Sequence, residues 1–116
     1  MYAARVTEME IEIARFDALC ARFRERAVLA LNEVAALHHQ AKLGSDSALQ
    51  EMGRVAHGLH GTGGSFGFDE LSRCARRMEL LLKRHPAPVG AVREHLLDIL
   101  GALTARLQNL LRGSGH

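Results

Sequence analysis

The segment that decides the fold is Val55-Ala56-His57-Gly58-Leu59-His60-Gly61-Thr62-Gly63-Gly64-Ser65-Phe66-Gly67. At 3.6 residues per turn, small and apolar residues recur there at intervals of four and three and form a packing stripe: Met52, Ala56, Leu59, Gly63 and Phe66. His57 lies just beside this stripe, and Gly61 and Gly64 follow it at helical spacing. Each helical glycine costs about 0.5–1 kcal/mol relative to alanine, so stability alone does not favour this run. The segment predicts a helix whose histidine is open to a large partner.

The chain from the amino terminus to the end of this segment is predicted to form two helices. A capping box at Thr7 predicts the first helix start, and Gly44 suits its end. We expect a bend near Asp17, because aspartate can cap a second start, so that a short helical segment precedes the first bundle helix. Another capping box, at Asp46, predicts a second helix that runs to about Phe66.

Two more helices follow a turn at Phe68 and Asp69. The third has apolar residues at helical spacing and ends before Pro86, because proline disfavours helix in the residue before it. The fourth shows a sustained four-three pattern of apolar residues between Val89 and Leu110. Short connections between amphipathic helices predict an all-α, antiparallel four-helix bundle with its core over about residues 17–112, and residues 113–116 are predicted to be disordered.

Composition limits the class of protein. A chain of 116 residues, 47% of them apolar, is predicted to be a single domain, residues 1–116. The net charge is only +2 and no basic run occurs, so no nucleic-acid partner is expected. There is neither a signal peptide nor a long apolar stretch, which predicts a cytoplasmic protein with no membrane contact. Cys20 and Cys74 are predicted to be buried free thiols, and the chain is predicted to be a monomer.

The histidine segment and its continuation resemble a known family. The run Ala56-His57-x-Leu59-x-Gly61 closely resembles the histidine-containing phosphotransfer (HPt) domains of bacterial phosphorelays. The resemblance continues through Gly64, Gly67, Leu71, Cys74, Met78 and Glu79. It implies an HPt-like bundle in which His57 carries the phosphoryl group. It also implies that Glu79, 22 residues further on, accepts a hydrogen bond from Nδ1 and orients the imidazole for attack by Nε2.

The chain departs from the family three residues after the histidine, where these domains usually have a lysine. Here the residue is His60, which can contact the phosphoryl group but is only partly charged at neutral pH. We expect an arginine to make up the missing charge if its side chain reaches the site; the candidates are Arg54, Arg73 and Arg76. The predicted partner surface consists of Gly61, Gly64, Arg54 and Arg76.

The resemblance implies a phosphocarrier that exchanges a phosphoryl group with the aspartate of response-regulator receiver domains or accepts it from a cognate histidine kinase. It would need no cofactor, because Mg²⁺ belongs to the receiver, and it would have no ATP-dependent activity of its own. Three alternatives stay open: the amino-terminal domain of a larger chemotaxis-type kinase, a non-catalytic interaction bundle, and a metal site. The metal site would use His57 and His60, which are spaced i, i+3 on one helix, although no second ligand pair is evident and no metal is expected.

Overall fold

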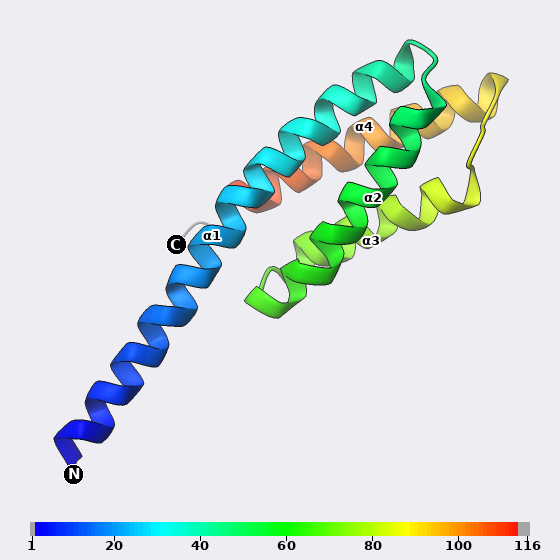
Figure 1. Cartoon of the computed structure of the whole chain (residues 1–116). Coiled ribbons are helices and arrows are strands. Elements are labelled where there is room, and N and C mark those ends of the chain that lie inside the picture. The colour runs from blue at the N-terminus through cyan, green and yellow to red at the C-terminus, as the bar shows by residue number, and fades with distance from the viewer. Residues whose placement is uncertain (1, 114–116) are drawn as a thin grey trace.

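The computed structural model describes residues 2–113, with side chains from residue 7 onward. Its elements in chain order are α1 (Tyr2–Lys42), α2 (Asp46–Gly63), the 3₁₀ turn η1 (Gly64–Phe66), α3 (Asp69–Arg84) and α4 (Gly90–Gly113). Each helix runs antiparallel to the one before it, and all four pack side by side (Figure 1). The predicted all-α, antiparallel four-helix bundle is confirmed.

The first helix is longer than expected. It is a single helix of 41 residues without a break, so the predicted bend near Asp17 is wrong. Thr7, the predicted start, lies inside the helix. The reason is that no glycine or proline occurs between Tyr2 and Lys42, so nothing in the sequence interrupts the backbone hydrogen bonds. The amino-terminal part of α1 therefore projects well beyond the other helices (Figure 1).

All four helices contribute to one apolar core. On α2 the predicted stripe is buried at Met52, Ala56, Leu59 and Gly63. The largest fully buried side chains are Leu31, Val34, Leu49, Met52, Leu71, Met78, Leu100 and Leu107. Of the two cysteines, Cys74 is buried as predicted, whereas Cys20 is only half-buried.

Three apolar residues at helical spacing on α1 or just before and within α4 are exposed rather than packed in the core. Phe16 lies on the projecting part of α1, where no other helix covers it, and its ring only approaches Phe66. Val89 precedes α4, which begins one residue later, and Val92 lies in its first turn. The buried face of α4 begins only at Leu96.

The connections fix how α2 meets α3. Ser45 caps α2 by accepting a hydrogen bond from the backbone N–H of Ala48, so the cap is one residue earlier than the predicted box. After η1 the chain reverses at Gly67, whose φ of +83° is a left-handed conformation that glycine adopts without strain. Phe68 N–H then donates to the carbonyl of Gly63 at 2.9 Å. This tight reversal holds the start of α3 against the end of α2.

No helix in the described part of the chain has the length and apolar character needed to cross a membrane. Gly113 ends α4, and the rest of the predicted disordered tail, residues 114–116, lies outside the described residues.

Candidate functional site

The site is a pair of contacts between α2 and α3, which lie antiparallel. Because of this arrangement, a step of three or four residues forward on α2 is matched by the same step backward on α3. His57 therefore lies opposite Glu79, and one turn further on His60 lies opposite Arg76. The structure thus brings together four of the residues that the sequence singled out.

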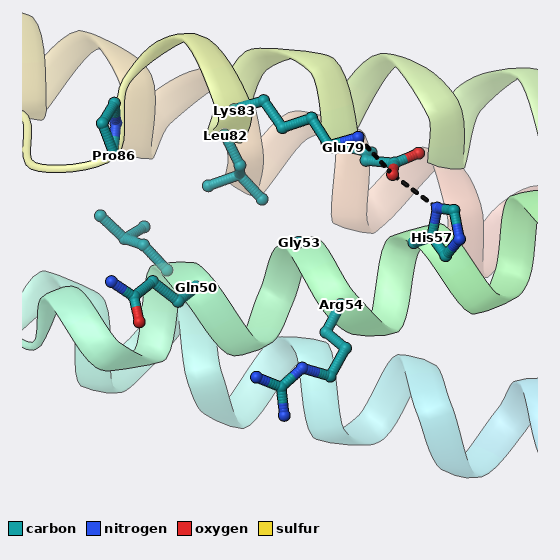
Figure 2. Close-up of a pocket in the computed structure, with 9 residues that line it drawn as sticks. Gln50, Gly53, Arg54, His57, Glu79, Leu82, Lys83 and Pro86 are labelled. Carbon is teal, nitrogen blue, oxygen red and sulfur yellow. Dashed lines mark hydrogen bonds and ion pairs between the residues drawn. The ribbon is translucent and has the colours of Figure 1, made fainter.

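The first contact joins the imidazole of His57 to a buried carboxylate. Nδ1 of His57 lies 2.6 Å from Oε2 of Glu79. The dashed line between the two side chains in Figure 2 marks this contact. The Glu79 side chain is only 5% exposed, and Lys83, one turn further along α3, reaches back to the same oxygen at 3.2 Å. Burial acts to raise the pKa of Glu79, but the hydrogen bonds and positive charges of His57 and Lys83 outweigh it and lower the pKa. Glu79 is therefore a carboxylate at neutral pH.

This carboxylate determines the proton position on His57. A carboxylate can only accept a hydrogen bond, so Nδ1 must carry the proton and donate it to Glu79. The lone pair is then on Nε2, to which no described residue forms a hydrogen bond. The His57 side chain is 69% exposed, so this nitrogen is open to a reaction partner.

The second contact is a short chain of hydrogen bonds around His60. Nη1 of Arg76 lies 3.3 Å from Nε2 of His60, and Nδ1 of the same ring lies 3.1 Å from the hydroxyl of Ser72. The Ser72 hydroxyl in turn donates to the backbone carbonyl of His60 at 2.8 Å. Ser72 is buried, so the chain ends in the packed interface between α2 and α3.

Hydrogen-bond chemistry allows only one proton arrangement in this chain. A guanidinium has donors and no acceptor, so Nε2 of His60 must accept from Arg76. Nδ1 of His60 then carries the proton and donates it to Ser72. The ring is neutral and both of its nitrogens are engaged. The positive charge at this position is therefore that of Arg76, held in place by His60.

The glycines after His57 keep the surface low. Gly61 is exposed, and a Cβ built on it would meet nothing within 4 Å. A Cβ on Gly64 would make only an ordinary contact, 3.7 Å from the Ser72 hydroxyl. The space above both residues is solvent, and neither glycine is required by packing inside the chain. Both positions are open to solvent, and their role as a partner surface stays a prediction.

On the other side of His57 an apolar groove of about 460 Å³ runs between α2 and α3. Its lining consists of Leu49, Gln50, Gly53, Arg54, His57, Glu79, Leu82, Lys83 and Pro86 (Figure 2). Gly53 forms part of its wall, since a Cβ there would touch Leu82 at 3.7 Å. His57 thus lies between a bare glycine surface and an open groove.

The other predicted arginines do not join these contacts. Arg54 forms an exposed ion pair with Glu51 at 3.2 Å and points away from Glu79 (Figure 2). Arg73 is exposed on α3. Of the three arginines proposed to compensate for the missing lysine, Arg76 is the one bonded to His60.

Sequence reasoning missed Ser72 and Lys83. Both belong to the row on α3 that faces α2, which recurs at intervals of four, three and four: Ser72, Arg76, Glu79 and Lys83. The Glu79–Lys83 spacing of i, i+4 is a recognised ion-pair signal and could have been used. Ser72 gives no such signal, because its role depends on the register of α3 against α2.

The described residues contain no group of three or more histidine, cysteine or acidic side chains placed to hold a metal ion. Comparison of the sequence with protein-family models gives a match to the Hpt domain over residues 7–113. Comparison with curated proteins and with solved structures gives no match.

Proposed function

The chain belongs to the Hpt domain family, and from this premise we propose that Nε2 of His57 accepts a phosphoryl group and exchanges it with the aspartate of receiver domains. The observation that carries the proposal is the contrast at Nε2. His57 has its Nδ1 proton fixed by Glu79 and its Nε2 exposed, as a nucleophilic imidazole requires. His60 has its Nε2 occupied by Arg76.

In the proposed reaction the Nε2 lone pair attacks the phosphorus of an aspartyl phosphate on the receiver. The new N–P bond forms as the P–O bond to the aspartate breaks, and the electron pair of that bond leaves with the carboxylate. Positive charge develops on the imidazole ring, and the Glu79 carboxylate stabilises it through the Nδ1–H hydrogen bond. The reverse reaction returns the phosphoryl group, so the same residues serve both directions.

Arg76 is proposed to take the role of the lysine that related domains have three residues after the histidine. His60 follows His57 by one turn of α2, which supports the proposal that the guanidinium bound to His60 would face the phosphoryl oxygens. His60 is proposed to position this charge rather than to supply it.

The phosphoryl donor and acceptor are proposed to be response-regulator receivers, with a cognate kinase upstream. Gly61 and Gly64 would lie under the receiver, whose own Mg²⁺ would serve the aspartyl phosphate. No cofactor is proposed for this chain, and its cytoplasmic location and monomeric state stay predictions.

The experiment is transfer of labelled phosphoryl group from a phosphorylated receiver domain to the purified chain. The unmodified chain should become labelled, and it should not be labelled by ATP alone. His57→Gln should take up no label, whereas His39→Gln, a matched change at an exposed histidine of α1, should behave as the unmodified chain. Label on the His57→Gln protein would refute the proposed acceptor.

A further inference from the structure

The projecting part of α1 continues the pattern that packs in the bundle. Within the bundle the helix buries Phe23, Ala27 and Val34 on the side that faces the other helices. Extending the same four-three spacing toward the amino terminus gives Cys20, Phe16, Ile13 and Met9. These four residues, here called the seam, therefore lie on the same side of α1 as its core residues.

The carboxyl-terminal end of the seam meets η1, where Cys20 Sγ lies 3.7 Å from the carbonyl of Phe66 and the Phe16 ring lies against the Phe66 ring, but none of the described helices covers Met9 and Ile13. Met9 is 57% and Ile13 59% exposed, whereas Phe23 is 3% exposed. α4, which packs against α1, ends at Gly113, and its last turn lies beside Arg24. The hydrogen bond from Arg24 Nη1 to the carbonyl of Leu111 marks this position on α1. An apolar stripe with coiled-coil spacing that runs on past its cover is suited to pairing with another helix.

The residues that flank the seam are acidic. In a helix pair, two kinds of position on each helix face the flanks of the partner helix. Here they are the positions directly after Met9 and Phe16 and those directly before Ile13 and Cys20. The charged residues among these positions are Glu10, Glu12 and Asp17. All three are exposed, and no basic residue occupies a flanking position in this part of the helix.

These charges oppose pairing between two copies of the projecting helix. In a parallel pair, Glu12 faces Asp17 of the second copy. In an antiparallel pair, Glu10 faces either Glu10 or Asp17 of the second copy, depending on the register. Every register that two projecting helices could form therefore sets like charges against each other.

One antiparallel register would match the charges, and the bundle blocks it. If the two antiparallel helices overlapped over a longer stretch, Glu10 would face Arg24 and Glu12 would face Arg26 of the second copy. That register also requires contact with Phe23, which is already buried by the chain's own core. The seam cannot use it.

We propose that the projecting helix, residues 7–20, is a docking site for a helix of another protein that has apolar seam residues and Lys or Arg at its flanking positions. The apolar seam supplies the contact area, and the acidic flanks select a basic partner over a second copy. The seam shares no residue with the contacts of His57, although it reaches η1 at Phe66, close to Gly64. The proposal does not depend on what His57 does.

The test uses two synthetic helices of three heptads with identical leucine seams, one flanked by lysine and the other by glutamate. Binding to the full chain is measured by calorimetry at low and high salt. The lysine peptide should bind at least about tenfold more tightly than the glutamate peptide, and salt should weaken it. The chain alone should sediment as a monomer.

Variants assign the binding to the proposed surface. The triple change Glu10→Lys, Glu12→Lys and Asp17→Lys should reverse the preference between the two peptides. Glu33→Lys with Glu94→Lys, matched changes on exposed parts of α1 and α4, should leave it unaltered. Met9→Gln with Ile13→Gln should remove binding of both peptides while helicity stays the same.

Three results would overturn the proposal. The first is equal or absent binding of the two peptides. The second is a dimer of the unmodified chain at physiological salt that Met9→Gln with Ile13→Gln dissociates. The third is seam-dependent binding to phosphatidylcholine vesicles with no preference between the peptides, which would mean that the seam takes a lipid surface instead.

Discussion

His57 and His60 lie one turn apart on α2, and each holds its Nδ1 against a side chain of α3, yet they differ at Nε2. For His57 the Nδ1 partner is the buried carboxylate of Glu79, and Nε2 faces solvent. For His60 the partner is Ser72, and Nε2 accepts from Arg76. The two imidazoles are thus suited to different roles. His57 can act as a nucleophile, and His60 holds the positive charge of Arg76 in place.

The comparison shows that the residues of α3 decide what each histidine can do. Glu79 can only accept, so it leaves the lone pair of His57 on the outer nitrogen. Arg76 can only donate, so it takes the lone pair of His60. Neither outcome could be inferred from α2 alone. The following changes test this difference, beginning with the largest expected effect.

Removing each imidazole in turn should separate the two roles. His57→Gln should abolish phosphoryl uptake, while its stability should change by less than about 0.5 kcal/mol because the site is exposed. His60→Gln should keep uptake at a rate within about tenfold of the unmodified chain. The measurement is acid-labile label on each protein after incubation with a phosphorylated receiver. Uptake by His57→Gln but not by His60→Gln would mean that the wrong histidine has been assigned.

Filling the bare surface beside His57 should block the partner without harming the fold. Gly64→Arg makes only an ordinary contact within the chain, so helicity should be preserved. Its long side chain should slow transfer by about a hundredfold or more, since it stands where the receiver must lie. Gly58→Arg is the matched control, because its Cβ also meets nothing and it lies toward α1. Normal transfer in a folded Gly64→Arg protein would remove the argument for an open surface.

Removing the carboxylate should slow transfer without stopping it. Glu79→Ala loses a hydrogen bond of about 1–3 kcal/mol, which would reduce the transfer rate by roughly ten- to a hundredfold if the bond strengthens in the transition state. Glu79→Gln keeps an acceptor oxygen for Nδ1 but not the charge. Its transfer rate should fall between those of the unmodified chain and Glu79→Ala. Single-turnover kinetics with one receiver gives the order. If Glu79→Gln transferred more slowly than Glu79→Ala, Glu79 would not act on the rate by fixing the tautomer of His57.

The charge held by His60 should matter less than the tautomer of His57. Arg76→Ala should slow transfer by several-fold to about tenfold, because one cation beside the phosphoryl oxygens is lost. Adding His60→Lys to that variant should restore the rate, since lysine supplies the charge directly. Arg77→Ala, at an exposed neighbour on α3, is the control. Failure of the lysine to restore the rate would show that Arg76 acts by another route.

The smallest effect is expected on stability in acid. Burial acts to raise the pKa of Glu79, but the bonds from His57 and Lys83 prevail and lower it, so its stabilising contribution is complete above the ordinary glutamate pKa of about 4.3. It is lost as the pH falls through the lowered value. The free energy of unfolding, measured by urea unfolding followed by circular dichroism, should therefore fall more steeply on acidification for the unmodified chain than for Glu79→Gln. Equal slopes would contradict the lowered pKa.

Much of the site was predictable because it depends on local spacing. The family resemblance implied the pairing of His57 with Glu79, and two antiparallel helices joined by a tight reversal bring residues at this 22-residue interval together. The contacts of Ser72 and Lys83 were not predicted, since they require the rotation of α3 about its own axis. The family resemblance likewise names a lysine position but gives no account of what replaces it.

The fold was predicted in outline, and its errors lie where local and distant signals compete. Asp17 offers a helix cap, but the chain around it has no glycine or proline, so the helix continues through it. Val89 and Val92 fit the spacing of α4, yet the core begins only at Leu96. Apolar spacing predicts which face a residue lies on and does not predict where the covering helix ends.

The central claim is that the phosphoryl group goes to Nε2 of His57 because Glu79 holds the proton on Nδ1. The most direct measurement is nitrogen-15 and phosphorus-31 NMR of the chain after it has been phosphorylated by a receiver. The account predicts one phosphorus, bonded to Nε2 of His57, with Nδ1 of the same ring still protonated and His60 unmodified. Phosphorus on Nδ1 of His57, or on either nitrogen of His60, would contradict it.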